Sequence, residues 1–120
     1  MSFLLKKIVV VDDDEDNRSA MKDILEFKGF SVVATAINGF DAVEKFYQHA
    51  PDVVLMDIMM PDFDGFYGIK NIKNINSDVK IIAITADQSD ETKQKLQELK
   101  HELIIYKPFD FELLMQMIND

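Results

Sequence analysis

The sequence predicts an α/β protein with a doubly wound sheet of five parallel strands and five helices. Five short apolar runs predict the strands, at positions 8–11, 30–34, 53–56, 81–84 and 103–105. Most of these runs are continuous and rich in Val and Ile, which is typical of strands buried on both faces of a parallel sheet. The run at 30–34 is the least apolar and is expected to form an edge strand. Segments with helical spacing follow the runs, and this alternation indicates βα units.

Residues that commonly end a helix follow the first two helical segments. Gly29 comes shortly after the first, where a left-handed residue often ends a helix. The apolar residues of that segment are Ala20, Met21, Ile24, Leu25 and Phe27. Pro51 follows the second segment, whose apolar residues are Ala42, Val43, Phe46 and Tyr47.

The other three helices are predicted by their apolar residues and their first turns. The third is expected within residues 65–75, with an inward face of Phe66, Ile69, Ile72 and Ile75. The fourth begins near Ser89, and Asp90 and Glu91 suit the positive end of its dipole. Only Leu96 and Leu99 form its apolar stripe. The last begins at Asp110 and carries Phe111, Leu114 and Ile118.

Composition limits the class of protein. A chain of 120 residues that is 48% hydrophobic is expected to form one domain, residues 1–120, with a real core. Its net charge of −9 disfavours nucleic acid and anionic membranes as direct partners. The absence of cysteine excludes disulfides and thiolate metal sites. The apolar runs are too short for a membrane span or a signal peptide, so we expect a soluble cytoplasmic protein.

Polar residues follow four of the five predicted strands. Asp12 and Asp13 come after the first, Asp57 after the third, Thr85 after the fourth and Lys107 after the fifth. In doubly wound folds, ligands bind beyond the carboxyl ends of the strands. We therefore expect these five side chains to meet in one site.

This set of side chains suits phosphoryl chemistry. Three clustered carboxylates stay ionised only if a cation joins them, and oxygen ligands without sulfur or histidine suit Mg²⁺. Lys107 can pair with a carboxylate or a phosphoryl oxygen, and Thr85 can donate a hydrogen bond. One carboxylate can then serve as the acceptor nucleophile. Each residue alone would be weak evidence, because acidic residues at strand ends are often helix caps or solvated loop residues. Asp14, Glu15 and Asp16 are expected to be of this kind, since they precede the first helix and suit its N-terminus.

The chain resembles the receiver domains of bacterial and archaeal response regulators over essentially its full length. The matching motifs are Ile8–Asp13, Asn38-Gly39, Asp52–Pro61 with Asp64-Gly65, Ile82–Ala86 and Lys107-Pro-Phe109. The resemblance implies a flavodoxin-like fold with strand order 2-1-3-4-5. It also implies a signalling domain rather than an enzyme, which receives a phosphoryl group from a sensor histidine kinase or a histidine phosphotransfer protein.

The resemblance further implies a role for each site residue. Asp57 is the implied phosphoacceptor, and Thr85 and Lys107 are implied to hold the phosphoryl oxygens. The implied Mg²⁺ ligands are Asp13, Asp57, the backbone carbonyl of Met59 and, through water, Asp12. The Lys107–Pro108 peptide bond is expected to be cis, as in similar proteins.

Three departures from the family pattern concern how a signal leaves the domain. Asp62 stands where glycine is usual, Lys100-His101 replaces a Gly-Ala pair, and Ile104 replaces an aromatic switch residue. The output surface is expected on the fourth helix, fifth strand and fifth helix. Strand alternation places Tyr106 on the same face as Ile104.

Other classes of protein fit the sequence less well. Asp12-x-Asp14-x-Asp16 resembles the start of an EF-hand loop, but Asn17 and Asp23 stand where Gly and Glu are required. Asp12-x-Asp14 also resembles a haloacid-dehalogenase-type phosphatase, which leaves Asp57 unexplained. A degenerate receiver, acting as an interaction module without phosphate, is a third alternative. The glycines form no nucleotide-binding loop, and both histidines, His49 and His101, are expected on the surface.

Overall fold

The computed structural model describes residues 5–101 and 103–120 and has one parallel sheet of five strands. The strands are β1 (Lys7–Val11), β2 (Ser31–Ala36), β3 (Val53–Asp57), β4 (Lys80–Thr85) and β5 (Ile104–Tyr106). Their order is β2-β1-β3-β4-β5, and all neighbouring pairs are parallel. The predicted fold class and strand order are confirmed, and β2 is an edge strand as expected.

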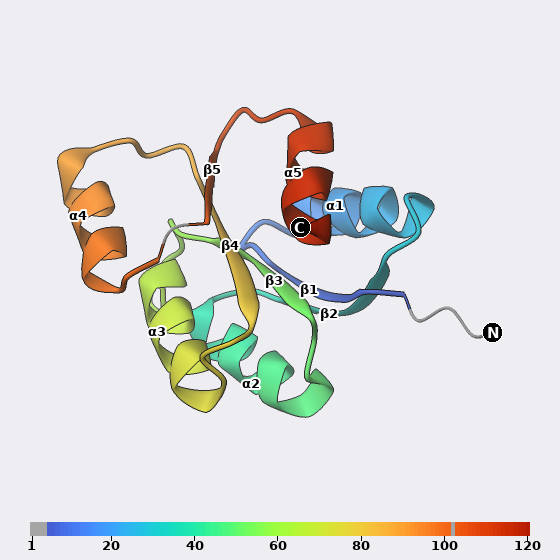
Figure 1. Ribbon diagram of the computed structural model, residues 1–120, viewed down its shortest axis with the longest axis horizontal. Coiled ribbons are helices and arrows are strands. Elements are labelled where there is room, and N and C mark those ends of the chain that lie inside the picture. The colour runs from blue at the N-terminus through green and yellow to red at the C-terminus, as the bar shows by residue number, and fades with distance from the viewer. Residues whose placement is uncertain (1–4, 102) are drawn as a thin grey trace.

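Helices cover both faces of this sheet (Figure 1). They are α1 (Glu15–Phe27), α2 (Gly39–His49), α3 (Gly65–Ile75), α4 (Asp90–Glu98) and α5 (Phe111–Asn119). Helices α1 and α5 pack on one face, and α2 and α3 pack on the other. Helix α4 stands at the β4–β5 end of the sheet, where Lys95 lies over the ring of Phe66 of α3. Within the described residues, no helix has the length and apolar composition that crossing a membrane requires.

The core consists of two layers, one on each side of the sheet. Along β1, Val9 and Val11 belong to the layer under α2 and α3, whereas Ile8 and Val10 belong to the layer under α1 and α5. Successive side chains of a strand point to opposite faces. Because both faces are covered, every position needs an apolar residue, which explains the continuous apolar runs.

A side-chain oxygen caps the start of each helix. The N-cap residues are Asp14, Asn38, Asp64, Ser89 and Asp110, and each accepts a hydrogen bond from a backbone N–H of the first turn. Such caps satisfy donors that have no partner within the helix. The expected helix-start role of Asp14 is confirmed. The caps also fix the short segments between strand ends and helices, where the predicted site residues lie.

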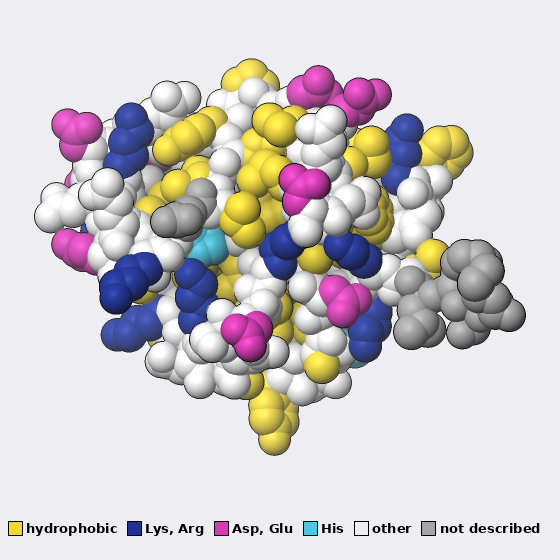
Figure 2. All heavy atoms as spheres, viewed as in Figure 1, with side chains coloured by type: hydrophobic (Ala, Val, Ile, Leu, Met, Phe, Trp, Pro, Cys, Tyr) yellow, Lys and Arg dark blue, Asp and Glu magenta, His cyan; other side chains and the backbone are white. Residues whose placement is uncertain are grey.

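Five residues of the predicted apolar stripes are exposed, namely Ala20, Ile24, Phe27, Tyr47 and Ile75. Figure 2 shows apolar side chains exposed among charged ones on one face of the molecule. Phe27 and Tyr47 are 85% and 80% exposed, and Ile75, which was expected to face inward, is 49% exposed. Phe27 lies about 200° around the helix axis from the buried Leu25. Ile75 is the last residue of α3, after the buried Ile72.

His101 is buried, so its expected place on the surface was wrong. It is 6% exposed, its Nε2 lies 3.0 Å from the carbonyl of Leu103, and its backbone N–H donates to Leu96. The chain reverses after α4 through Lys100, whose φ of 54° is left-handed, and this reversal turns His101 inward. Burial, together with the charge of Lys73, lowers the pKa of His101 to about 4. The ring is therefore neutral at physiological pH. His49, in contrast, is exposed as expected.

Candidate functional site

Three carboxylates meet at the carboxyl ends of β1 and β3. Asp12, Asp13 and Asp57 each offer an oxygen, and these oxygens lie within 4.8 Å of one another. The pairing of Val11 with Met56 brings the ends of the two strands side by side. Asp57 is 7% exposed, Asp12 is partly buried and Asp13 is exposed. The cluster is therefore open to solvent on the Asp13 side and closed on the Asp57 side.

Hydrogen bonds hold the β1–α1 segment in place. The backbone N–H of Asp12 donates to Ala36 at 3.1 Å, and its Oδ1 accepts from the N–H of Asp14 at 2.9 Å. Arg18 Nη1 donates to the carbonyl of Asp12 at 2.8 Å. Sequence reasoning missed Arg18. It is the only arginine of the chain, but nothing in its spacing indicated that it would turn back to β1.

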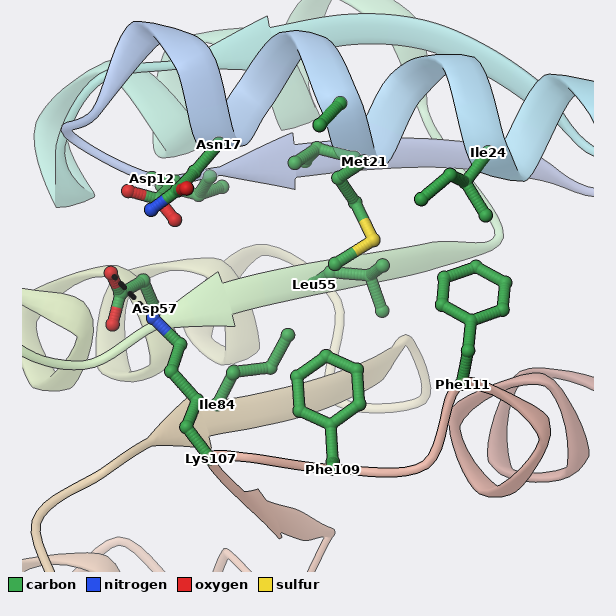
Figure 3. A pocket seen from close by; sticks show the side chains of 13 residues that line it. Asp12, Asn17, Met21, Ile24, Leu55, Asp57, Ile84, Lys107, Phe109 and Phe111 are labelled. Atoms are coloured by element: carbon green, nitrogen blue, oxygen red, sulfur yellow. Dashed lines mark ion pairs between the residues drawn. The ribbon is translucent and has the colours of Figure 1, made fainter.

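Lys107 faces Asp57 across the site, with Nζ 3.7 Å from Oδ2 (Figure 3). The pKa of Asp57 is nevertheless raised above its usual value, mainly because burial disfavours the charged form. Lys107 and the backbone N–H of Met59 act in the opposite direction, and the charges of Asp12 and Asp13 add to the rise. One ammonium group thus does not balance three carboxylates, and the site favours a further cation.

Thr85 ends β4, the strand beside β3. Its side chain is fully buried, and its Oγ1 accepts a hydrogen bond from the N–H of Asp87 at 3.0 Å. Its carbonyl accepts from the N–H of Lys107 at 2.9 Å, so the ends of β4 and β5 are joined at this edge. The hydroxyl hydrogen of Thr85 remains available to donate.

The segment between β3 and α3 passes close to Asp57. A Cβ on Gly65 would collide with the backbone of Asp57 and Ile58, so only glycine allows this approach. Asp62 has a φ of 66°, the left-handed conformation that glycine adopts most easily and that Asp tolerates. This explains why glycine suits position 62 and how Asp replaces it. Met59, whose backbone N–H bonds to Asp57, is 56% exposed.

An apolar groove leads away from Asp57 between α1 and the segment that joins β5 to α5. Its volume is about 340 Å³. Met21 and Ile24 of α1 face Phe109 and Phe111 across it, as Figure 3 shows. Ile24 is 44% exposed. The sequence identified these residues as apolar but gave no sign that they line a groove.

The structure brings four of the predicted site residues into direct proximity, namely Asp12, Asp13, Asp57 and Lys107. Thr85 ends the adjacent strand, and Met59 lies two residues beyond Asp57. The cluster contains only hard oxygen donors, which are the ligands that Mg²⁺ prefers. The donor set therefore fits this ion. The Lys107–Pro108 bond is cis, as expected.

Comparisons with known proteins agree with this geometry. The family model of the response regulator receiver domain matches residues 8–119. The chemotaxis protein CheY of Bacillus subtilis (strain 168) is 54% identical over 59 residues, so the match spans about half of each chain, 49% of both. A CheY-like receiver domain protein from Methanospirillum hungatei JF-1 has a TM-score of 0.88 and 28% identity, covering 97% of this chain and 92% of that one.

A second solved structure is the CheX-CheY-BeF3-Mg complex from Borrelia burgdorferi. It has a TM-score of 0.84 and 27% identity, and the match covers 94% of this chain and 86% of that one. The residues matched by the family model, 8–119, include Asp12, Asp13 and Asp57. The chain belongs to the response regulator receiver domain family of two-component signalling.

Proposed function

We propose that residues 1–120 form a single receiver domain that accepts a phosphoryl group on Asp57 in a reaction that requires Mg²⁺. The donor is a sensor histidine kinase or a histidine phosphotransfer protein. The observation that carries this proposal is the cluster of three carboxylates facing the Lys107 ammonium, with Asp57 as the buried member. A buried carboxylate between two others and a lysine is placed to act as a nucleophile.

In the proposed reaction, an Asp57 oxygen attacks the phosphorus of the donor's phosphohistidine. The P–N bond breaks, and its electron pair remains on the imidazole nitrogen. Lys107 and Thr85 stabilise the phosphoryl oxygens by charge and by hydrogen bonding. Mg²⁺, held by Asp13, Asp57, the carbonyl of Met59 and, through water, Asp12, would offset the negative charge that gathers there.

The apolar groove beside Asp57 is the proposed docking place for the donor. It opens from the acceptor carboxylate, and Met21, Ile24 and Phe109 line it. An interaction surface needs exposed apolar area near its centre, and Ile24 provides it at 44% exposure. A donor helix that carries the phosphohistidine could fill the groove and bring its phosphorus to Asp57.

The proposed output surface consists of α4, β5 and α5. Ile104 takes the place of the aromatic switch and is partly buried against the same core layer as Leu96 and Leu99. A β-branched side chain has few χ1 states, so only a slight repacking is expected of it. Tyr106, which pairs with Thr85 in the sheet, is the aromatic residue placed to respond.

Phosphorylation by acetyl phosphate, with and without Mg²⁺, tests the proposal. Incorporation should require Mg²⁺ and stop in excess chelator. Asp13→Ala should reduce Mg²⁺ binding, measured by calorimetry, at least tenfold, because one carboxylate ligand is lost. Asp16→Ala, which removes an exposed carboxylate outside the cluster, is the matched control. Normal incorporation in the presence of chelator would contradict the proposal.

A further inference from the structure

Hydrogen bonds connect Thr85 to the first turn of α4 through Asp87. The N–H of Asp87 donates to Thr85 Oγ1 at 3.0 Å. Its carboxylate accepts from the N–H of Ser89 at 2.8 Å and from Thr92 Oγ1 at 2.8 Å. Thr85 and Thr92, at the two ends of this chain of bonds, are 0% and 4% exposed. The chain of bonds therefore runs from the phosphorylation site into the interior side of α4.

Asp87 provides much of the attachment of the start of α4. Only Thr92 and Leu96 are buried among the residues of α4. Leu96 lies in the second half of the helix, so Thr92 is the buried residue of its first half. The hydrogen bonds from Ser89 and Thr92 also lower the pKa of Asp87, which is therefore ionised at neutral pH. Hydrogen bonds to a charged acceptor are stronger than neutral ones.

We propose that Asp87 is a positioning residue that couples the Thr85 hydroxyl to α4. This inference rests on the proposed phosphorylation of Asp57. Without a phosphoryl group, the N–H of Asp87 holds Thr85 Oγ1. When Thr85 donates its hydroxyl to a phosphoryl oxygen on β3, the oxygen moves away from Asp87. Asp87 then loses its fixed position, and the bonds from Ser89 and Thr92 that hold the first turn of α4 weaken.

Thermodynamic linkage gives this coupling a testable sign. If the phosphoryl group loosens the bonds through Asp87, then breaking those bonds beforehand must strengthen the binding of a phosphoryl mimic. A residue with a purely structural role behaves differently: its loss lowers stability and leaves the affinity for the mimic unchanged or weaker. Affinity for the phosphoryl mimic therefore rises while the stability of the fold falls only if Asp87 and Thr92 restrain Thr85.

The test is calorimetric binding of beryllofluoride, in excess Mg²⁺, to the wild type and to Thr92→Val. Valine keeps the shape of the buried threonine and removes the donor to Asp87. We expect Thr92→Val to bind beryllofluoride about three- to tenfold more tightly, the range that one hydrogen bond spans, and to melt at a lower temperature. Thr92→Ser keeps the hydroxyl and should retain the affinity of the wild type.

Leu96→Ala is the matched control. It removes packing from α4 but leaves Asp87 and Thr92 in place, so it should lower stability without tightening binding. Equal or weaker affinity of Thr92→Val, or equal tightening by Leu96→Ala, would overturn the coupling. If Thr92→Val fails to fold, Asp87→Ala takes its place with the same expectation. Failure of the wild type itself to bind beryllofluoride would instead overturn the proposed phosphorylation.

Discussion

At the scale of single residues, the site is defined by an imbalance of charge. Asp57 is buried beside two other carboxylates, and Lys107 is the cation that offsets them among the described residues. The raised pKa of Asp57 shows that burial and repulsion outweigh Lys107. The excess negative charge is one that a divalent cation would offset, and it has consequences for stability as well as for binding.

Asp57→Asn should therefore stabilise the protein when no divalent cation is present. The folded-state pKa of Asp57 lies above its unfolded value of 3.8. Over the interval between the two, the folded state binds more protons, so the stability of the wild type falls as pH rises. At pH 7 we expect the variant to be more stable and to have a higher Tm, because it lacks the charge that burial disfavours. The pairing with Lys107 does not reverse this sign, since the pKa of Asp57 is raised despite it.

Thermal melts between pH 3.5 and 8, in a chelating buffer, check this prediction. The advantage of Asp57→Asn should grow as pH rises through the raised pKa and vanish at low pH. Asp23→Asn, which removes an exposed carboxylate of α1, should show no such dependence. A variant that is less stable than the wild type at pH 7 would show that Asp57 is not destabilising.

The phosphoryl group on Asp57 should be long-lived, because Met59 offers no hydrogen bond to orient an attacking water. The carboxylate of Asp87, two residues after Thr85, does not supply that hydrogen bond, because it is engaged by Ser89 and Thr92. We expect Met59→Asn to lose the phosphoryl group several-fold faster, measured as decay of a radiolabel after the donor is removed. A rate equal to or below that of the wild type would count against this role for Met59.

At the scale of elements, α4 is held by few buried side chains. Thr92 and Leu96 are buried, and only Leu96 joins the core layer that α2 and α3 share with β1, β3 and β4. Elements with few buried apolar contacts open at low free-energy cost. The thin two-leucine stripe was visible in the sequence. The contribution of Thr92 was not visible, because nothing in the sequence indicates that its hydroxyl is buried and bonded to Asp87.

Hydrogen exchange with and without beryllofluoride should locate the response in residues 86–106. We expect the largest change in the first turn of α4, because it is linked to Thr85 through Asp87. Helices α1 and α2 serve as internal references, since both lie outside the β4–α4–β5 region. Changes confined to those two helices, with residues 86–106 unaffected, would show that the signal leaves by another face.

At the scale of the whole molecule, sequence periodicity predicted what depends on local pattern. The apolar runs marked all five strands, and the residues directly after them, such as Asp57 and Lys107, meet at one edge of the sheet. Features that depend on packing between distant segments were missed or wrong. His101 is buried by a chain reversal, Arg18 turns back to Asp12, and the groove beside Ile24 forms only where α1 faces Phe109 and Phe111.

The position of the phosphoryl group tests the central claim most directly. The wild type, Asp57→Asn and Asp12→Asn should be treated with acetyl phosphate and Mg²⁺, and the phosphorylated residue trapped by reduction and located by mass spectrometry. Asp57 should carry the label in the wild type, and Asp57→Asn should carry none. Label on Asp12 would indicate a phosphatase of the haloacid dehalogenase type. A wild type that stays unlabelled would indicate an interaction module, and undiminished labelling of Asp57→Asn would contradict the account outright.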